Sequence, residues 1–261
     1  MKLLETRSLC VRAGEKWACR NLDLAISEGQ CWGILGGNGI GKTSLLHAFC
    51  GIGKAASGEI LLGEKPLSGL SRRQIAKLSG ILFQDADDLF PSTVEEIVLA
   101  GRHPHVDPLR GETPADFRIA REAIAAAGLA GMEKRLSSTL SGGERRRLSI
   151  AALLAQEPDL YLLDEPTNHL DISHQVGMID LFASLSGRKS VVMILHDPNL
   201  VSIYCYRVLL LFGEGRTLCG PSSEILTERN LSELYGHPMQ SVEGPCGTVF
   251  LPLIRRHRPP V

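Results

Sequence analysis

The sequence predicts an α/β protein with a parallel sheet, an antiparallel β subdomain and a helical insertion. Short, continuous apolar runs alternate with helical stretches, which is typical of parallel strands that are covered on both faces. Residues 1–35 instead alternate polar and apolar side chains, as half-buried antiparallel strands do. From about residue 85 to about residue 150 the pattern is helical, which indicates an insertion into the α/β domain.

Composition limits the class of protein. The chain of 261 residues is 44% hydrophobic and 22% charged, and its net charge of −1 argues against a nucleic-acid partner. Seven cysteines without a CxxC pair fit a reducing compartment better than a disulfide framework or a zinc site. We see no apolar segment of a signal peptide and no run near the roughly 20 residues that span a bilayer. A role at a membrane would therefore require docking on another protein.

A glycine-rich stretch is the strongest motif. Residues 31–35 predict a buried strand, and residues 36–46, GGNGIGKTSLL, match the spacing GxxxxGK[ST] before a helix. The backbone N–H groups of such a loop form an anion nest, to which the helix adds the positive end of its dipole. Lys42 can reach the β- and γ-phosphates, and the Thr43 hydroxyl can ligate Mg²⁺. The residues expected around the phosphates are Gly36, Gly37, Asn38, Gly39, Ile40, Gly41, Lys42, Thr43 and Ser44.

The other elements follow in order. The further strands are predicted at Glu59–Leu62, Leu78–Phe83, Leu160–Leu163, Val191–Leu195 and Val208–Phe212. A turn signal at residues 213–215 predicts a hairpin, and a short helix is expected to end near Tyr235. We expect one domain over residues 1–235 and a C-terminal extension over residues 236–261 with a frayed end.

Two helices are predicted inside the insertion. Thr93 and Glu96 form a capping box at the start of the first, and Thr113 with Pro114 opens the second. The second helix ends at Gly128, and its apolar stripe is expected to face the core at Phe117, Ala120, Ile124 and Ala127.

Polar residues follow three of the predicted strands. Because ligands bind at the carboxyl ends of parallel strands, we expect Gln84, Asp164, Glu165 and His196 to meet near the phosphate loop. Asp164 is placed to hold Mg²⁺, directly or through water. Glu165 can orient and deprotonate an attacking water, which favours hydrolysis over transfer; an ion pair with Arg or Lys is its alternative. His196 can bond the γ-phosphate, although a lone histidine there is usually structural.

A second phosphate site is predicted at LSGGE, which begins at Leu140. Ser141 and Glu144 form another capping box, and Gly142 and Gly143 leave the first amides of the helix uncovered. Capping alone does not require two glycines, so phosphate binding is the preferred interpretation. The next three residues, 145–147, are all arginine, and we interpret them as a solvated helix face.

In this order and spacing, the motifs GGNGIGKT, LSGGE, LYLLDEP and NHLD resemble the nucleotide-binding subunit of an ATP-binding cassette (ABC) transporter. The resemblance covers nearly the whole chain, and LSGGE is specific to that superfamily. It implies that the chain binds ATP with Mg²⁺ and hydrolyses ATP. It implies that Glu165 is the catalytic base and that Lys42, Gln84 and His196 also take part in catalysis. It further implies that Thr43, Gln84 and Asp164 hold the magnesium ion and that Asp171 belongs to the D-loop.

The resemblance also implies partners. ATP would lie between the phosphate loop of one copy and residues 141–143 of a second copy in a head-to-tail dimer. Gln84 would couple the nucleotide to integral membrane permease subunits, which receive cargo from a substrate-binding protein. The chain is then expected as a peripheral protein at the cytoplasmic face of the cell membrane.

A narrower resemblance concerns cargo. GRHPH at residues 101–105, DEPTNHLDISHQ, HDPNL and LTERNLSELYG are similar to importer ATPases for iron siderophores, haem and vitamin B12. His103 and His105 make an incomplete metal site, so we favour a place on the surface that faces the permease. The family's adenine-stacking aromatic would fall near Ala13. Trp17 is the nearest substitute, and an ordinary core or surface role for Trp17 is equally compatible.

Several alternatives stay open. Within the superfamily the chain could serve an importer for another substrate, or be half of an exporter. A soluble cassette protein without a transporter is a different class, although a single cassette with a Gln84 region favours membrane docking. LSGGE and Glu165 disfavour a P-loop kinase.

Overall fold

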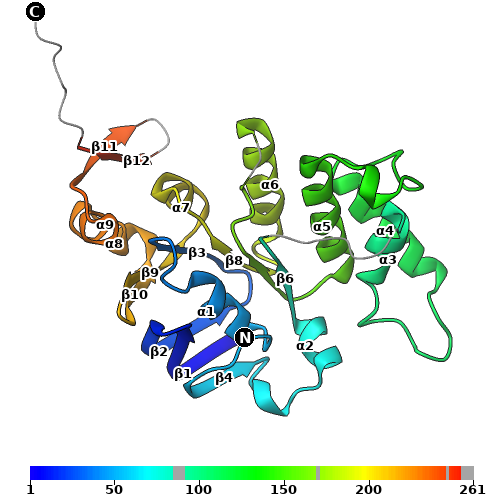
Figure 1. The fold of residues 1–261 in the computed structure, drawn as a ribbon, viewed down its shortest axis with the longest axis horizontal. Coiled ribbons are helices and arrows are strands. Elements are labelled where there is room, and N and C mark those ends of the chain that lie inside the picture. Colours follow the sequence, from blue (N-terminus) through cyan, green and yellow to red (C-terminus); the bar gives the residue numbers. More distant parts are fainter. Residues whose placement is uncertain (85–91, 169–170, 245–246, 254–261) are drawn as a thin grey trace, which may run out of the picture.

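A six-stranded sheet forms the centre of the molecule (Figure 1). The structure is a computed structural model, and it describes residues 1–84, 92–168, 171–244 and 247–253. The strand order is β10-β9-β3-β8-β7-β6, in which only the β9–β10 hairpin is antiparallel. Its strands are β3 (Cys31–Gly36), β6 (Ser79–Leu82), β7 (Leu160–Leu163), β8 (Ser190–Ile194), β9 (Arg207–Gly213) and β10 (Arg216–Pro221). The predicted parallel sheet and its final hairpin are therefore confirmed.

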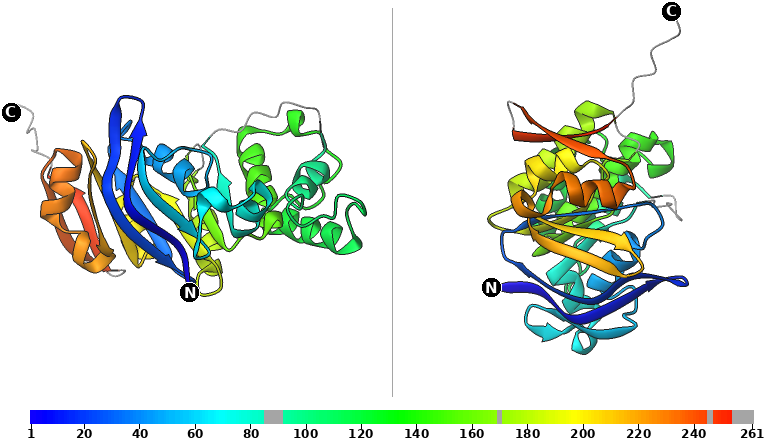
Figure 2. Two further views of the ribbon diagram at one scale, coloured as in Figure 1. Left: turned by 90° about the horizontal axis from the view of Figure 1, so that it is seen from below. Right: turned by 90° about the vertical axis from the view of Figure 1, so that its left-hand side faces the viewer.

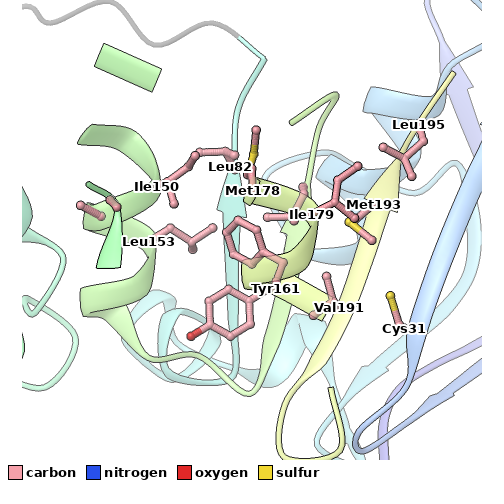
Figure 3. Close-up of a cluster of buried hydrophobic side chains, with 14 of the residues drawn as sticks. Cys31, Leu82, Ile150, Leu153, Tyr161, Met178, Ile179, Val191, Met193 and Leu195 are labelled. Carbon is pink, nitrogen blue, oxygen red and sulfur yellow. The ribbon is translucent and has the colours of Figure 1, made fainter. Parts of the chain in front are cut away.

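Both faces of this sheet are buried, which explains the continuous apolar runs. In β7, Leu160 and Leu162 face one core cluster, whereas Tyr161 and Leu163 face the other. Figure 3 shows Tyr161 among apolar side chains of two covering helices, α5 (Gly142–Gln156) and α6 (Ile172–Leu185). Helices on one side and a second sheet on the other exclude water from the strands, so alternation disappears from their sequence.

The opposite face is covered by an antiparallel sheet and by α1 (Lys42–Phe49). This sheet has the order β2-β1-β4-β5. Its strands are β1 (Lys2–Ala13), β2 (Lys16–Ser27), β4 (Ser57–Leu62) and β5 (Lys65–Pro66). Leu45 and Phe49 of α1 are fully buried in the cluster between the two sheets. The predicted antiparallel subdomain is therefore present, and it packs on the helix that follows the phosphate loop.

One strand prediction is wrong at its start. Leu78 is the last residue of a helix, α2 (Arg72–Leu78), and β6 begins only at Ser79. This helix follows a 3-10 turn, η1 (Leu67–Gly69). Ser71 and Gln74 form a complete capping box at its N-terminus, with both reciprocal hydrogen bonds present. That pair was the signal in the sequence for a helix here.

The helical insertion lies at the opposite end of the molecule from the C-terminal hairpin (Figure 2, left). It contains α3 (Val94–Ala100), α4 (Pro114–Ala126), a 3-10 turn, η2 (Ser137–Thr139), and α5. Both predicted capping boxes, at Thr93 and Ser141, are present. The predicted stripe of α4 needs one correction, because Phe117 is 37% exposed. Asp116 takes the inward position instead, since its carboxylate pairs with Arg102.

The C-terminal helices α8 (Ser222–Ile225) and α9 (Glu228–Tyr235) contact the β9–β10 edge of the main sheet. The C-terminal part also contains α7 (Pro198–Tyr204) and a hairpin that the sequence analysis did not predict, of β11 (Met239–Gly244) and β12 (Gly247–Pro252). The expected frayed end, residues 255–261, lies outside the described residues. Within the described ranges, we find no helix that combines the length and the apolar character needed to cross a bilayer.

Candidate functional site

The phosphate loop joins the end of β3 to α1 in a conformation that requires glycine. Gly41 is the N-cap of α1 and has φ +101°. A Cβ atom there would lie 2.5 Å from the Ala18 Cβ and 2.8 Å from the Ala13 Cβ. A side chain at residue 41 would therefore clash as well as strain the backbone. The helix begins at Lys42, as predicted.

Lys42 is almost completely buried at the base of the loop. Its Nζ donates to the carbonyl oxygens of Gly36 and Gly37, each at 2.9 Å. Burial lowers the pKa of Lys42, while the nearby carboxylates of Glu165 and Asp164 act against that shift. A cation with two neutral acceptors and little solvent is well placed for an anionic ligand.

A cavity of about 520 Å³ brings the loop and the strand ends together. Gln84, Glu165 and His196 line it, as the carboxyl ends of the parallel strands predict. The rest of the lining is Ala13, Asn38, Gly39, Gly41, Lys42, Thr43, Ser44 and Asn168. Three predicted loop residues stay behind this surface: Gly36 and Gly37 face Lys42 with their carbonyl groups, and Ile40 packs on the core.

Asp164 lies directly after β7 and is 1% exposed. Neither carboxylate oxygen has a hydrogen-bond partner among the described residues. Burial raises the pKa of Asp164, and the Thr43 hydroxyl, which lies close but outside hydrogen-bond geometry, opposes the rise. A buried carboxylate with free oxygens beside a hydroxyl fits Mg²⁺, which prefers oxygen ligands and binds through one or two carboxylates plus substrate phosphates. The described residues contain no cluster of three His, Cys, Asp or Glu, so this site would depend on the nucleotide for further ligands.

Glu165 and His196 contact each other directly. The His196 Nε2 lies 2.9 Å from the Glu165 Oε1, and the Glu165 side chain is only 13% exposed. Asn168 donates its side-chain N–H to the Glu165 Oε2, and the Tyr235 hydroxyl donates to the His196 carbonyl oxygen at 3.1 Å. Glu165 has φ +44°, a left-handed conformation that is costly for this residue type. The sequence analysis named Asn168 only within the motif NHLD and gave Tyr235 no role in the site; the position of Asn168 three residues after Glu165 was a further signal.

The start of α5 does not line this cavity. Ser141 and Glu144 complete their capping box, with the Ser141 N–H bonded to the Glu144 Oε2 at 2.7 Å. A Cβ on Gly142 would meet nothing within 4 Å, and one on Gly143 would meet only the Arg147 Nη1 at 3.9 Å. Packing against the residues that the structure describes therefore does not explain either glycine.

The structure tests two further interpretations of the sequence, the solvated arginines and the role of Trp17. The solvated face predicted at residues 145–147 is wrong for Arg146, which donates to the backbone at the ends of β6 and β7. Trp17 does not line the cavity, since its ring lies between the guanidinium groups of Arg12 and Arg20, at 4.2 and 4.8 Å.

The two histidines of GRHPH also lie away from the cavity. The His105 Nε2 is 2.9 Å from the carbonyl oxygen of Gln156, so this side chain ties the connection between α3 and α4 to the end of α5. His103 is exposed.

Comparison with known proteins identifies the family. The family model described as "ABC transporter" matches residues 19–168, more than half of the chain. The ferric enterobactin transport ATP-binding protein FepC of Escherichia coli K12 is 32% identical over 260 residues, 98% of this chain and 96% of that protein. The hemin import ATP-binding protein HmuV of Pseudomonas aeruginosa is 37% identical over 240 residues, 90% and 92% of the two chains.

A solved structure agrees with these sequence matches. An inward-facing structure described as that of a metal-chelate type ABC transporter superposes with a TM-score of 0.84 at 30% identity. The match covers 98% of this chain and 99% of that one. With the phosphate loop, the LSGGE helix and the acidic end of β7 in one fold, this chain belongs to the ABC transporter family.

Proposed function

We propose that this chain is the ATP-binding and ATP-hydrolysing subunit of an importer for iron siderophores, haem or cobalamin. The observation that carries the proposal is the meeting of Lys42, Glu165 and His196 in one cavity beside the phosphate loop. Members of this family hydrolyse ATP to drive transport, and this chain keeps an acid, a cation and a histidine where that reaction needs them.

In this proposal, the loop amides and Lys42 hold the β- and γ-phosphates of ATP. A water molecule attacks the γ-phosphorus while the Glu165 Oε1 accepts its proton, and the bond between the γ-phosphorus and the bridging oxygen of ADP breaks. His196 already lies within hydrogen-bond distance of that carboxylate oxygen, so it orients Glu165. Because water accepts the phosphoryl group in this step, the reaction is hydrolysis and requires no second substrate.

We assign Asp164, Thr43 and Gln84 to the magnesium site. Bound Mg²⁺ supplies charge neutralisation on the phosphate oxygens. The contribution of the protein is a carboxylate that is buried beside the phosphate loop with both oxygens available. Gln84 reaches the same cavity from the end of β6.

We further propose a head-to-tail dimer of this chain. Ser141, Gly142 and Gly143 do not line the cavity of their own chain, and among the described residues only the Arg147 Nη1 comes within 4 Å of a Cβ placed on either glycine. A nucleotide bound to a second copy would fill that space, because bare amides at a helix start attract a phosphate.

The permease is expected to dock beside Gln84. An apolar groove of about 350 Å³ runs between the end of α1 and β6, and Ile52 and Phe83 on its walls are 51% and 39% exposed. Such a surface would place a permease next to Gln84. The chain would then act as a peripheral protein at the cytoplasmic face of the membrane, and a binding protein would deliver cargo to the permease.

The cargo class is inferred from the relatives, a ferric enterobactin transport protein at 32% identity and a hemin import protein at 37% identity. We place the ABC unit at residues 1–235 and treat residues 236–261 as an extension. The β11–β12 hairpin in this extension packs on α7 through Asn199.

Glu165→Gln tests the hydrolysis proposal. The amide keeps the shape of the carboxylate and one accepting oxygen but takes up no proton, so ATP binding should persist while turnover falls by at least about 100-fold. Release of phosphate by the purified chain with its permease measures the effect, and Glu214→Gln on the distant β9–β10 turn is the control. A variant that keeps half of the wild-type rate would remove Glu165 from the role of base.

Deletion of the gene tests the cargo. Uptake of labelled ferric siderophore, haem or cobalamin should fall, and expression of the wild-type chain, but not of Glu165→Gln, should restore it. Unchanged uptake of all three compounds would refute the cargo class while leaving the ATPase assignment intact.

A further inference from the structure

One side chain of α5 reaches the ends of two neighbouring strands of the main sheet. The Arg146 Nη1 donates to the carbonyl oxygens of Phe83 and, at 3.1 Å, of Gln84, just after β6. The Arg146 Nη2 donates to the carbonyl oxygens of Asp164 and Glu165, each at 3.1 Å, just after β7. We call this arrangement the Arg146 fork.

The fork takes over where the sheet stops. The last pair of β6 and β7 is Leu82 with Leu163, and the Asp164 N–H still donates to the Leu82 carbonyl oxygen at 3.0 Å. The carbonyl groups of the next residues along each strand, Phe83, Gln84, Asp164 and Glu165, accept from Arg146. A planar guanidinium with five donors can serve both strand ends at once, whereas a lysine ammonium acts as a single point.

The same contact supports the strained residue of the site. Glu165 has φ +44°, a conformation that persists only where surrounding contacts hold it. The Arg146 fork holds its backbone carbonyl, and Asn168 and His196 hold its carboxylate from the other side. Arg146 itself does not line the nucleotide cavity.

We propose that Arg146 is a positioning residue for hydrolysis, which sets Glu165 and Gln84 relative to α5. The inference rests on the proposed function, because it assumes that Glu165 is the base. The first residues of α5 are the glycines that would contact ATP bound to a second copy. The Arg146 fork connects the same helix to Glu165 of its own chain. A tilt of α5 would move Glu165 through one side chain.

Arg146→Met tests this role, because it keeps the length and apolar packing of the side chain and removes every donor. We expect kcat for MgATP to fall by at least about tenfold, since a small displacement of a base is costly, while KM changes by less than about twofold. The kcat of Arg146→Lys should lie between those of wild type and Arg146→Met, because an ammonium group can bond to only one strand end. The matched control is Arg118→Met, at a residue of α4 whose side chain is 70% exposed.

Amide hydrogen exchange supplies a readout that does not depend on catalysis. Exchange over residues 163–168 should be faster in Arg146→Met than in the wild type and in Arg118→Met. If Arg146→Met does not fold, Arg146→Lys and Arg146→Gln provide the same two measurements.

The positioning role of Arg146 would be overturned by a kcat of Arg146→Met within twofold of wild type, or by unchanged hydrogen exchange over residues 163–168. A loss of kcat that only follows the folded fraction would do so as well. If the wild-type chain hydrolyses no ATP in the presence of its permease, the proposed function is refuted instead. Amide hydrogen exchange over residues 163–168 would then be the remaining test of whether Arg146 holds the end of β7.

Discussion

At the scale of single residues, Asp164 is the group whose environment most directly suggests a missing ligand. Its carboxylate is buried, its oxygens have no hydrogen-bond partner among the described residues, and burial raises its pKa. A raised pKa means that the ionised form is disfavoured in the folded chain. The charge therefore costs stability as pH rises through the pKa of the folded state, unless a cation compensates for it.

Asp164→Asn should consequently stabilise the chain without ligand and remove its response to MgATP. At neutral pH the melting temperature of the variant should exceed that of wild type, because an amide carries no buried charge, and the difference should shrink as the pH is lowered. Added MgATP should raise the melting temperature of wild type only. Asp159→Asn, at a half-exposed carboxylate paired with Lys189, is the control and should show no gain. A lower melting temperature for Asp164→Asn without ligand would contradict this account.

At the scale of elements, the start of α5 carries two glycines that packing among the described residues does not explain. Ala is a better helix former than Gly, and there is room for a Cβ at both Gly142 and Gly143. The double variant Gly142→Ala, Gly143→Ala should therefore keep or gain stability while losing ATP-dependent dimerisation. Light scattering of the Glu165→Gln chain with MgATP measures dimerisation, and the control is Gly177→Ala, in the open part of α6. Unchanged dimerisation of the double variant would count against a nucleotide bound across the two copies.

One side chain of α7 forms two hydrogen bonds with the C-terminal hairpin. The Asn199 Nδ2 donates to the Phe250 carbonyl oxygen at 3.2 Å, and the Phe250 N–H donates to the Asn199 Oδ1 at 2.7 Å. Asn199→Ala leaves both backbone groups without these partners, which should lower the free energy of unfolding by about 1–3 kcal/mol. Urea denaturation measures the loss. Ile203→Ala, at a residue of α7 that is 55% exposed, should change it far less, and equal losses would show that the hairpin does not rely on this pair.

At the scale of the whole molecule, the groove before Gln84 is where we expect the permease. A charge at Ile52 would have to be buried in that interface, so Ile52→Glu should abolish co-purification with the permease. Circular dichroism checks that the variant folds. Leu109→Glu, at a residue that is 96% exposed on the connection between α3 and α4, is the control. Co-purification of Ile52→Glu at the wild-type level would place the docking surface elsewhere.

Much of this architecture could be predicted from local patterns. Apolar runs of four or five residues predicted the strands β3, β7 and β8, because both faces of these strands are covered and every position is buried. Capping boxes predicted the starts of α3 and α5, because a cap is a contact over three residues of sequence. The family resemblance and the meeting of strand-end residues near the phosphate loop followed in the same way.

The errors arose where a distant partner decides the outcome. Asp116 displaced Phe117 from the core of α4 because of Arg102, fourteen residues earlier in the chain. Arg146 resembled a solvated arginine until the folded chain placed four backbone carbonyls around it. The sequence analysis missed the β11–β12 hairpin, whose strands are half exposed and bury only Phe250.

The sequence by itself determined the family, the nucleotide loop and the positions of the acid and histidine at strand ends, because motif spacing and burial patterns are local. Only the tertiary structure decided that the buried Asp164 carboxylate has no hydrogen-bond partner among the described residues, that His196 contacts Glu165, and that Arg146 joins both strand ends to α5. These are contacts between segments far apart in the chain, and their geometry exists only once the sheet has formed.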